Sequence, residues 1–289
     1  MILDWLIVAK NLDNYTMEKI NKKKDFYKWK YVAFLLFSNN ESSKTYVNMK
    51  QKKANKFWLL TKIIEKPDIQ ENEALKIINE LNNDNNCIWI LIQLPLNENI
   101  KNIQWKLLSS VHPKKDIDWL WWILFWLHQI WKINFLPATA RAVFEILYFY
   151  KIWISWKNIS VLWQSNLIWK PVTIEIINKL WTVFSFNSFS NKNTLKKLTY
   201  NSEIIISAAN ELLFIDKTYV NPNKMQVLID VWRWKINNNP VWNFNFDDIF
   251  FNFNENNFMY TPVPWWVWPV TVSSIFANLV DLQDIDIYF

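Results

Sequence analysis

Glycine is absent from this chain of 289 residues, although it makes up about 7% of ordinary proteins. Tryptophan, with 21 residues, holds roughly the share that glycine normally takes. Without glycine, the chain lacks the residue that adopts positive φ at the lowest cost. Ordinary folding does not produce such a composition, and the two anomalies point to one cause.

Arginine is nearly absent as well, with only Arg141 and Arg233 against 30 lysines. Arginine is the side chain that most often reads base edges, and the lysines are scattered without forming a basic stripe. The net charge of +6 therefore indicates a solvated lysine-rich surface, and we expect no nucleic-acid partner. The single cysteine, Cys87, excludes an internal disulfide and fits a reducing compartment.

Long apolar runs are also missing. The most apolar stretch, Trp119 to Leu127, has nine residues, whereas a spanning helix needs about 20. The first residues include an acid, Asp4, where a signal peptide has a basic flank. We therefore expect a cytoplasmic protein without a membrane segment.

Many tryptophans occupy positions where local sequence favours glycine. Trp163 and Trp169 enclose the segment Gln164–Ile168 directly after an apolar run, and Trp265, Trp266 and Trp268 lie between two prolines. Glycine at such turns permits unusual φ and close approach of the backbone to phosphate. Lysine, asparagine and isoleucine abundance indicates an AT-rich gene, and some bacteria read the UGA codon as glycine. We interpret most of the tryptophans as glycines; the alternative is a true tryptophan-rich protein that binds through aromatic faces.

Apolar runs alternate with helical patterns along the chain. Asp68–Leu81 has helical spacing, and so does Val172–Leu180. Buried strands are predicted at five runs: Ile88–Leu94, Ile159–Leu162, Thr182–Phe186, Glu203–Ala209 and Met225–Val231. Strands alternating with helices predict an α/β fold with parallel sheets. The pattern from Thr139 onward is Rossmann-like, with a boundary near Pro137.

Several polar residues within these patterns are candidates for chemistry. Tyr46 and Lys50 lie four residues apart, hence on one helical face, and burial together with neighbouring cations would lower the pKa of the lysine toward neutrality. Gln93 is a polar residue inside an apolar strand end, and Asp116 and Asp118 precede Trp119. Each signal alone has a plain structural explanation as a surface pair, a satisfied buried amide or loop acids.

Taken in order with tryptophan read as glycine, these segments resemble the bifunctional methylenetetrahydrofolate dehydrogenase/cyclohydrolase family over almost the whole chain. The matching segments are Ser43-x-x-Tyr46-Val47-x-x-Lys50-x-Lys52, Leu91–Leu96, Lys115–Trp119, Trp163–Pro171, Ile229–Trp232 and Thr261–Thr271. The last segment is the most specific. Each motif tryptophan falls on a family glycine, which supports the glycine interpretation independently.

The resemblance implies an N-terminal α/β catalytic domain (residues 1–138), a Rossmann-like NAD(P)-binding domain (139–268) with a cleft between the two, and a C-terminal segment (269–289) that packs back on the first domain. It implies oxidation of 5,10-methylenetetrahydrofolate to the methenyl form with a nicotinamide cofactor, followed by hydrolysis to 10-formyltetrahydrofolate. A homodimer is also implied.

The resemblance also assigns roles to residues of this chain. Lys50 is the general acid/base, Tyr46 packs against the folate and places the lysine, Gln93 hydrogen-bonds the lysine, and Asp118 anchors the pterin. Further residues are implied beside the folate (Pro264, Trp265 and Trp266) and beside the dinucleotide (Trp163, Gln164, Ser165, Trp169, Ser188 and Arg233).

Departures from the family pattern concern the cofactor. Gln164 and Phe189 stand where the family commonly has arginines, the natural clamps for a 2′-phosphate. Lys170, Lys192 or Arg233 are candidates to compensate. NADP is the expected cofactor, with NAD open. Loss of one activity, leaving a cyclohydrolase alone, and a non-catalytic folate-binding paralogue are the alternatives, and retention of Tyr46, Lys50, Gln93 and Asp118 speaks against the second.

Overall fold

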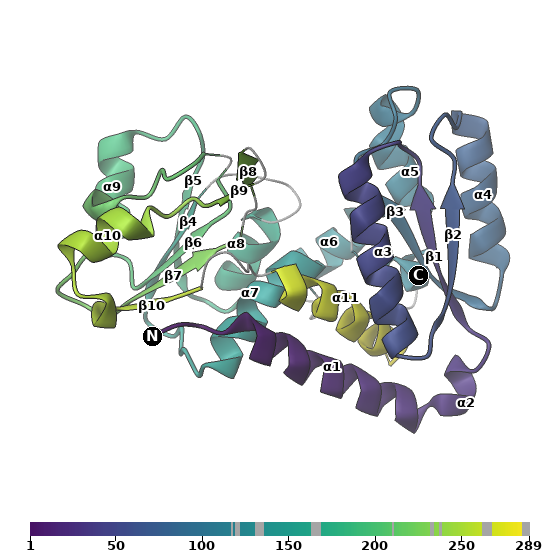
Figure 1. The fold of residues 1–289 in the computed structure, drawn as a ribbon, viewed down its shortest axis with the longest axis horizontal. Coiled ribbons are helices and arrows are strands. Elements are labelled where there is room, and N and C mark those ends of the chain that lie inside the picture. The colour runs from purple at the N-terminus through teal and green to yellow at the C-terminus, as the bar shows by residue number, and fades with distance from the viewer. Residues whose placement is uncertain are drawn as a thin grey trace. The chain divides into compact units, whose positions relative to one another are not determined.

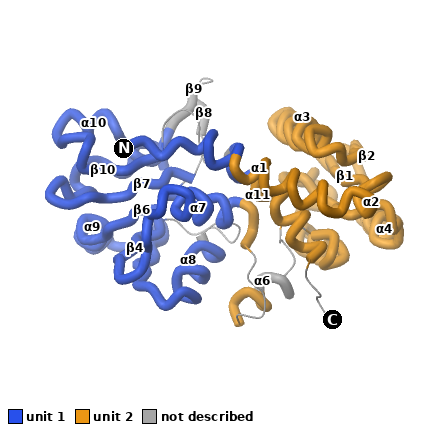
Figure 2. The backbone as a smooth tube through the Cα atoms, turned by 90° about the horizontal axis from the view of Figure 1, so that it is seen from below, with its two compact units in different colours: residues 1–10, 139–271 blue, residues 11–138, 272–289 orange. Residues whose placement is uncertain are grey.

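The computed structural model describes residues 1–116, 118, 122–130, 136–162, 169–209, 211–231, 234–236, 239–261 and 268–284. The chain divides into two compact units, coloured separately in Figure 2. Residues 11–138 and 272–289 form what we call the three-stranded unit, and residues 1–10 and 139–271 form the five-stranded unit.

The three-stranded unit contains a parallel sheet in the order β2-β1-β3 (Figure 1). Its strands are β1 (Tyr31–Leu36), β2 (Leu60–Glu65) and β3 (Cys87–Gln93). Its helices are α1 (Trp5–Lys22, which begins in the other unit), α2 (Lys24–Tyr27), α3 (Glu41–Lys56), α4 (Glu71–Asn83), α5 (Gln104–Ser110), α6 (Trp122–Gln129) and most of α11 (Trp268–Leu282). Short 3₁₀ turns occur at Lys101–Ile103 and Pro113–Lys115.

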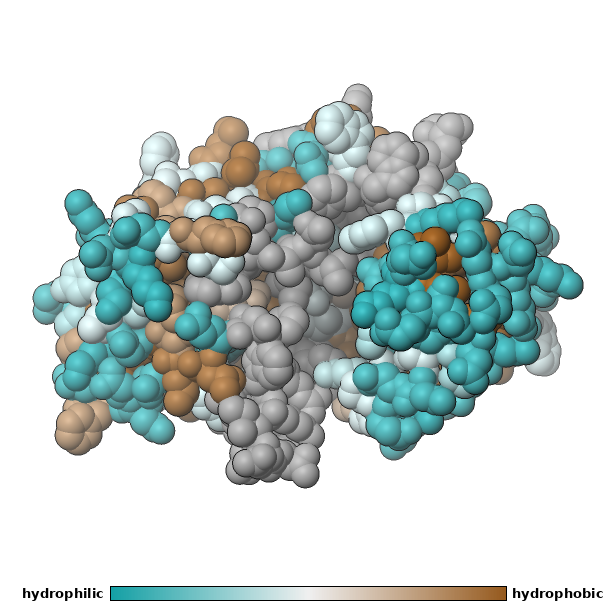
Figure 3. All heavy atoms as spheres, turned by 90° about the horizontal axis from the view of Figure 1, so that it is seen from above, coloured by the Kyte–Doolittle hydropathy of each residue, from teal (hydrophilic) through white to brown (hydrophobic). Residues whose placement is uncertain are grey.

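Both faces of this small sheet are covered, as parallel sheets require. Ala74, Ile78 and Leu81 form the buried stripe of α4 and pack with the strands on one face. On the other face Trp89 of β3 contacts Phe276 of α11, with ring centroids 5.4 Å apart. Figure 3 shows hydrophilic side chains over much of the visible surface of this unit, which agrees with a solvated lysine-rich exterior.

The five-stranded unit is built around an all-parallel sheet in the order β10-β7-β6-β4-β5. Its strands are β4 (Asn158–Leu162), β5 (Thr182–Phe186), β6 (Ile204–Ser207), β7 (Gln226–Asp230) and β10 (Phe258–Tyr260), with a separate antiparallel pair, β8 (Trp234–Ile236) and β9 (Asn239–Val241). Its helices are α7 (Ala138–Phe149), α8 (Trp169–Asn178), α9 (Lys192–Asn201) and α10 (Phe246–Asn252), with 3₁₀ turns at Lys217–Tyr219 and Glu255–Asn257.

The topology has a consequence for ligand binding. After β4 the chain passes to β5 on one side, and later returns to β6 on the other side of β4. Ligands of open α/β sheets bind beyond the carboxyl ends of the strands at such a switch point. The α/β fold and all five predicted strands are confirmed, and the predicted helices Asp68–Leu81 and Val172–Leu180 correspond to α4 and α8.

The first ten residues group with the five-stranded unit. The physical reason is backbone pairing with β10. Ile2 forms a parallel bridge with Tyr260, the Leu3 amide donates to the Tyr260 carbonyl at 2.8 Å, and the terminal ammonium donates to the Phe258 carbonyl at 2.6 Å. Among the described residues, no helix combines the length and the apolar character needed to cross a bilayer.

Candidate active site

Helix α3 places two of the predicted site residues on one face of the three-stranded unit. The helix begins after Asn40, whose side chain accepts a hydrogen bond from the Ser43 amide at 3.0 Å, an ordinary N-cap. Tyr46 and Lys50 follow one turn apart, with Tyr46 half-buried and Lys50 only 8% exposed. The spacing seen in the sequence thus becomes a shared helical face.

Lys50 meets the carboxyl end of the neighbouring sheet. Its Nζ donates a hydrogen bond of 3.2 Å to Oε1 of Gln93, the last residue of β3. The other end of the same amide is also held, because Gln93 Nε2 donates to the Leu94 carbonyl at 2.8 Å. The amide orientation is therefore fixed, and Gln93 presents its oxygen to the lysine.

Asp118 completes the electrostatic environment of Lys50. Burial lowers the pKa of Lys50, and the negative charge of Asp118 acts in the opposite direction. Burial raises the pKa of Asp118, with the charge of Lys50 opposing that rise. A buried lysine that is not neutralised by a closely bonded carboxylate is a candidate proton carrier near neutral pH.

Ser43 is a site residue to which the sequence analysis gave no role. Its side chain is buried, and Oγ donates to the Leu94 carbonyl at 3.1 Å, the same carbonyl that receives the Gln93 amide. The first turn of α3 is thereby tied to the residue that follows β3, beside a cis Leu94–Pro95 bond. The Asn40-x-x-Ser43 spacing is the sequence signal that could have located this turn.

The C-terminal half of α3 is bonded to a buried carboxylate. Asp13 of α1 accepts from Lys53 Nζ at 2.6 Å and from Lys56 Nζ at 3.0 Å, and Ser273 Oγ of α11 donates to it at 2.9 Å. Burial lowers the pKa of Lys53 while Asp13 opposes that change. Lys50 therefore projects from a helix that is held at both ends.

The predicted dinucleotide site is described only in part. Trp163, Gln164, Ser165 and Arg233 lie outside the described residues, as do Pro264, Trp265 and Trp266 of the predicted folate site. Trp169 is the first residue of α8. Ser188 is exposed in the turn after β5.

That turn has a neutral composition. Residues 187–191 include no acidic and no basic side chain, and Phe189 is 95% exposed. The Asn187 and Asn191 side chains accept hydrogen bonds from nearby backbone amides and shape the turn and the start of α9. Lys192, the first residue of α9, is exposed and supplies positive charge next to the turn. The turn therefore lacks the acid that would repel a 2′-phosphate.

The chain matches two family models in sequence. Residues 3–118 match the tetrahydrofolate dehydrogenase/cyclohydrolase catalytic domain, and residues 137–286 match the NAD(P)-binding domain of the same family. A protein described as bifunctional protein FolD from Lactobacillus acidophilus is 30% identical over 284 residues, covering 97% of this chain and 96% of the relative. Another from Clostridium novyi is 33% identical over 251 residues, covering 86% and 87%.

Solved structures agree with the sequence matches. The bifunctional dehydrogenase/cyclohydrolase from Campylobacter jejuni has a TM-score of 0.89 at 25% identity, with 98% of each chain covered. The Trypanosoma brucei enzyme, solved with NADP and an inhibitor, has a TM-score of 0.87 at 25% identity, covering 98% of this chain and 97% of that one. These matches agree with the family that the order of motifs along the sequence indicates. The chain belongs to the tetrahydrofolate dehydrogenase/cyclohydrolase family.

Proposed function

We propose that Lys50 is the acid/base residue of both reactions of a bifunctional folate enzyme. The enzyme oxidises 5,10-methylenetetrahydrofolate to the 5,10-methenyl form and hydrolyses that product to 10-formyltetrahydrofolate. The observation that carries the assignment is the buried amine of Lys50, bonded to a neutral amide oxygen. Burial lowers the lysine pKa, so that the amine accepts a proton closer to neutral pH than an exposed lysine does.

The hydrolytic step needs proton transfers that this amine can perform. Water adds to the cationic carbon between N5 and N10 and gives one proton to Lys50, which leaves a hydroxyl on that carbon. The bond from that carbon to N5 then breaks as the carbonyl forms; N5 takes the electron pair and the proton held by Lys50, and the hydroxyl proton leaves to solvent. Gln93 holds the amine toward the reacting carbon, Tyr46 packs against the folate, and Asp118 binds the pterin edge.

NADP is the cofactor that the chain best accommodates, and when bound it accepts the hydride of the first step. The switch point between β4 and β6 supplies the usual place for a dinucleotide. Support for a 2′-phosphate comes from the turn with Ser188, which carries no acidic side chain, and from the adjacent exposed Lys192. Trp163, Gln164, Ser165, Trp169 and Arg233 remain predicted cofactor contacts.

The remaining expectations stay proposals: the homodimer, the cytoplasmic location, the folate cleft between the domains, and Pro264, Trp265 and Trp266 beside the folate. A variant assay tests the central assignment. Lys50→Met should abolish cyclohydrolase turnover while folate binding stays within a few-fold; persistent turnover would mean that another residue moves the proton.

We also propose that the natural protein carries glycine at tryptophan positions. Six described residues have positive φ, and three of them are tryptophans, Trp29 (67°), Trp58 (57°) and Trp156 (64°), although tryptophan supplies only 21 of the 289 residues. Positive φ is a genuine outlier for a bulky residue and is easily adopted by glycine. Backbone geometry, which is independent of the family motifs, therefore supports the same substitution.

Trp58 gives the most specific support. The Trp58 amide donates to the Asn55 carbonyl at 3.0 Å, and the Leu59 amide donates to the Ala54 carbonyl at 3.1 Å. These two bonds form the Schellman motif that ends α3, with Trp58 at the position where glycine is the usual residue. The Trp58 side chain is 66% exposed, so no burial offsets its backbone strain.

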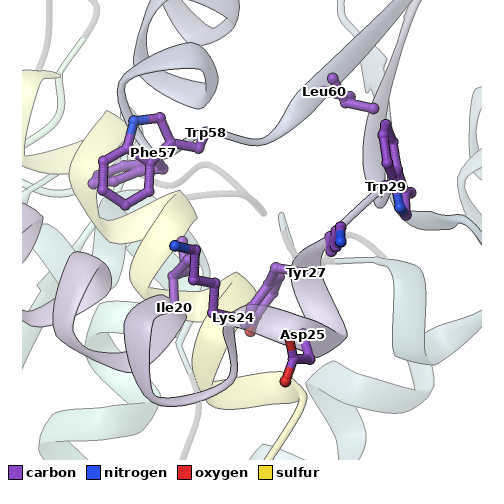
Figure 4. A pocket seen from close by; sticks show the side chains of 9 residues that line it. Ile20, Lys24, Asp25, Tyr27, Trp29, Phe57, Trp58 and Leu60 are labelled. Carbon is purple, nitrogen blue, oxygen red and sulfur yellow. The ribbon is translucent and has the colours of Figure 1, made fainter.

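Trp29 and Trp58 also line a hollow of about 710 Å³ in the three-stranded unit (Figure 4). Glycine at both positions would remove two of its walls, so the hollow is not assigned as a binding site. The decisive measurement is the mass of the tryptic peptide Phe57–Lys62 from the natural protein. A glycine mass at position 58 supports the proposal, and a tryptophan mass refutes it.

A further inference from the structure

Asn243 lies at the centre of a buried hydrogen-bond network in the five-stranded unit. Its side chain is fully buried, as is that of Ser207 at the end of β6. Asn243 Nδ2 donates to the Ala209 carbonyl at 2.7 Å and to the Glu211 carbonyl at 3.0 Å. Its Oδ1 accepts from Ser207 Oγ at 3.0 Å. Both amide protons and one oxygen lone pair of Asn243 are therefore used.

The backbone of Asn243 is itself bonded at the carboxyl end of a second strand, β7. Asp230, the last residue of β7, is buried, and its Oδ2 accepts from the Asn243 amide at 2.7 Å. The segment that carries Asn243 also pairs with the chain beyond the loop, because the Ile215 amide donates to the Asn243 carbonyl at 2.9 Å. The backbone of Asn243 is thus held on both its amide and its carbonyl. Its side chain is therefore presented to the loop from a fixed position.

The loop held by Asn243 lies at the switch point of the sheet. It follows β6 directly, and the Ala208 amide donates to the carbonyl of Leu162, the last residue of β4, at 3.1 Å. The carboxyl ends of β4 and β6 are the expected edge of a dinucleotide site. The two carbonyls bonded to Asn243 belong to residues on either side of position 210.

We propose that Asn243 is a positioning residue for the dinucleotide: its amide holds the carbonyls of Ala209 and Glu211, which follow β6, in the position that NADP binding requires. The inference rests on NADP as the cofactor. Removing the amide leaves the buried Ala209 carbonyl and Ser207 hydroxyl without this partner, and it frees the part-buried Glu211 carbonyl. These residues then move to satisfy the buried groups. Affinity for NADP falls, whereas hydrolysis of methenyltetrahydrofolate, which uses no dinucleotide, continues.

The test compares two buried side-chain amides, one near the carboxyl ends of the strands (Asn243) and one at the amino end of β7 (Gln226). Gln226, the first residue of β7, is also fully buried, and its amide bonds the Ser202 carbonyl at 2.6 Å and the Asn221 amide at 2.6 Å. Gln226→Ala therefore removes a similar network at the edge away from the strand carboxyl ends. It should lower the unfolding temperature without changing the Kd for NADP.

For Asn243→Ala we expect the Kd for NADP, measured by titration without folate, to rise by about tenfold or more. The cyclohydrolase kcat/KM should stay within about twofold, since the proposed proton carrier Lys50 and its partner Gln93 lie in the other unit. If Asn243→Ala does not fold, Ser207→Ala tests the same network more gently and should weaken NADP by about threefold. The proposal is overturned if the Kd of the folded variant is unchanged, if both activities fall together, or if Gln226→Ala weakens NADP equally.

Failure of NADP as the cofactor can be distinguished from failure of the role given to Asn243. The parent protein would then bind no NADP while still hydrolysing methenyltetrahydrofolate. That result contradicts NADP as the cofactor and, with it, the role given to Asn243. Weak binding in Asn243→Ala alone, beside a parent that binds NADP, supports both.

Discussion

The amino group of Lys50 on α3 donates its 3.2 Å hydrogen bond to an amide oxygen of Gln93, not to a carboxylate. An amide oxygen orients the amine without adding a negative charge that would stabilise the protonated form. The charge that does act on Lys50 comes from Asp118. Orientation and charge are therefore supplied by two different residues, which makes them separable by substitution.

Lys50→Met separates catalysis from stability. We expect cyclohydrolase turnover to be lost, because methionine fills the buried space but carries no proton. Lys44→Met is the matched control on the same helix, since Lys44 pairs with the exposed Glu41. Turnover measured with methenyltetrahydrofolate should be unchanged in that control. Equal losses in both variants would indicate damage to α3 and not loss of a proton carrier.

The same substitution should raise the unfolding temperature at neutral pH. Burial depresses the pKa of folded Lys50 below its ordinary value of 10.5, so the charged form opposes folding. This destabilisation is complete below the depressed pKa and disappears as pH rises through 10.5, where both states are neutral. Thermal unfolding of Lys50→Met should therefore show a gain at pH 7 that vanishes in alkali; a loss at pH 7 would contradict the burial argument.

Asp118→Asn should shift the pH profile of cyclohydrolysis. The Asp118 charge raises the Lys50 pKa against the effect of burial, so its removal lowers that pKa further. The rising limb that reports deprotonation of Lys50 then moves to lower pH. Glu98→Gln, which removes an exposed carboxylate of the same unit, should leave the profile in place. A shift to higher pH after Asp118→Asn would reverse the assigned sign.

Some of this arrangement is readable in the sequence because it depends on local spacing. Tyr46 and Lys50 share a helical face in any helix, and the apolar run before Gln93 predicts a buried strand that the structure contains as β3. The motif order also identifies the family. These signals are independent of how the elements pack.

Other features depend on contacts between distant segments. The pairing of β1 with β3 sets Leu36 opposite Gln93 and brings α3 and β3 together at the site. No local sequence pattern predicts this register. β2 was not predicted, because it is an edge strand whose exposed positions interrupt the apolar pattern. The pairing of residues 1–3 with β10 likewise requires the folded partner, and no local pattern indicates it.

Lys192→Ala tests cofactor selectivity. The lysine is exposed at the start of α9, next to the neutral turn that contains Ser188. If Lys192 interacts with the 2′-phosphate, its loss raises the KM for NADP by about threefold to fivefold and leaves the KM for NAD unchanged. Lys197→Ala, on an exposed position of the same helix, should change neither. Equal effects of Lys192→Ala on both cofactors would remove the lysine from phosphate recognition.

Trp58→Gly should stabilise the tryptophan-containing chain. A left-handed conformation costs a bulky residue about 1–2 kcal/mol, and glycine recovers this minus its larger entropy in the unfolded state, for a net gain of about 1 kcal/mol. Trp105 is also exposed but lies in the helix α5, where glycine is less favourable than tryptophan by about 0.5 kcal/mol. Urea unfolding should therefore move in opposite directions for Trp58→Gly and Trp105→Gly. A loss of stability in Trp58→Gly would mean that the backbone at the end of α3 does not favour glycine, and the strongest structural support for glycine at this position would fail.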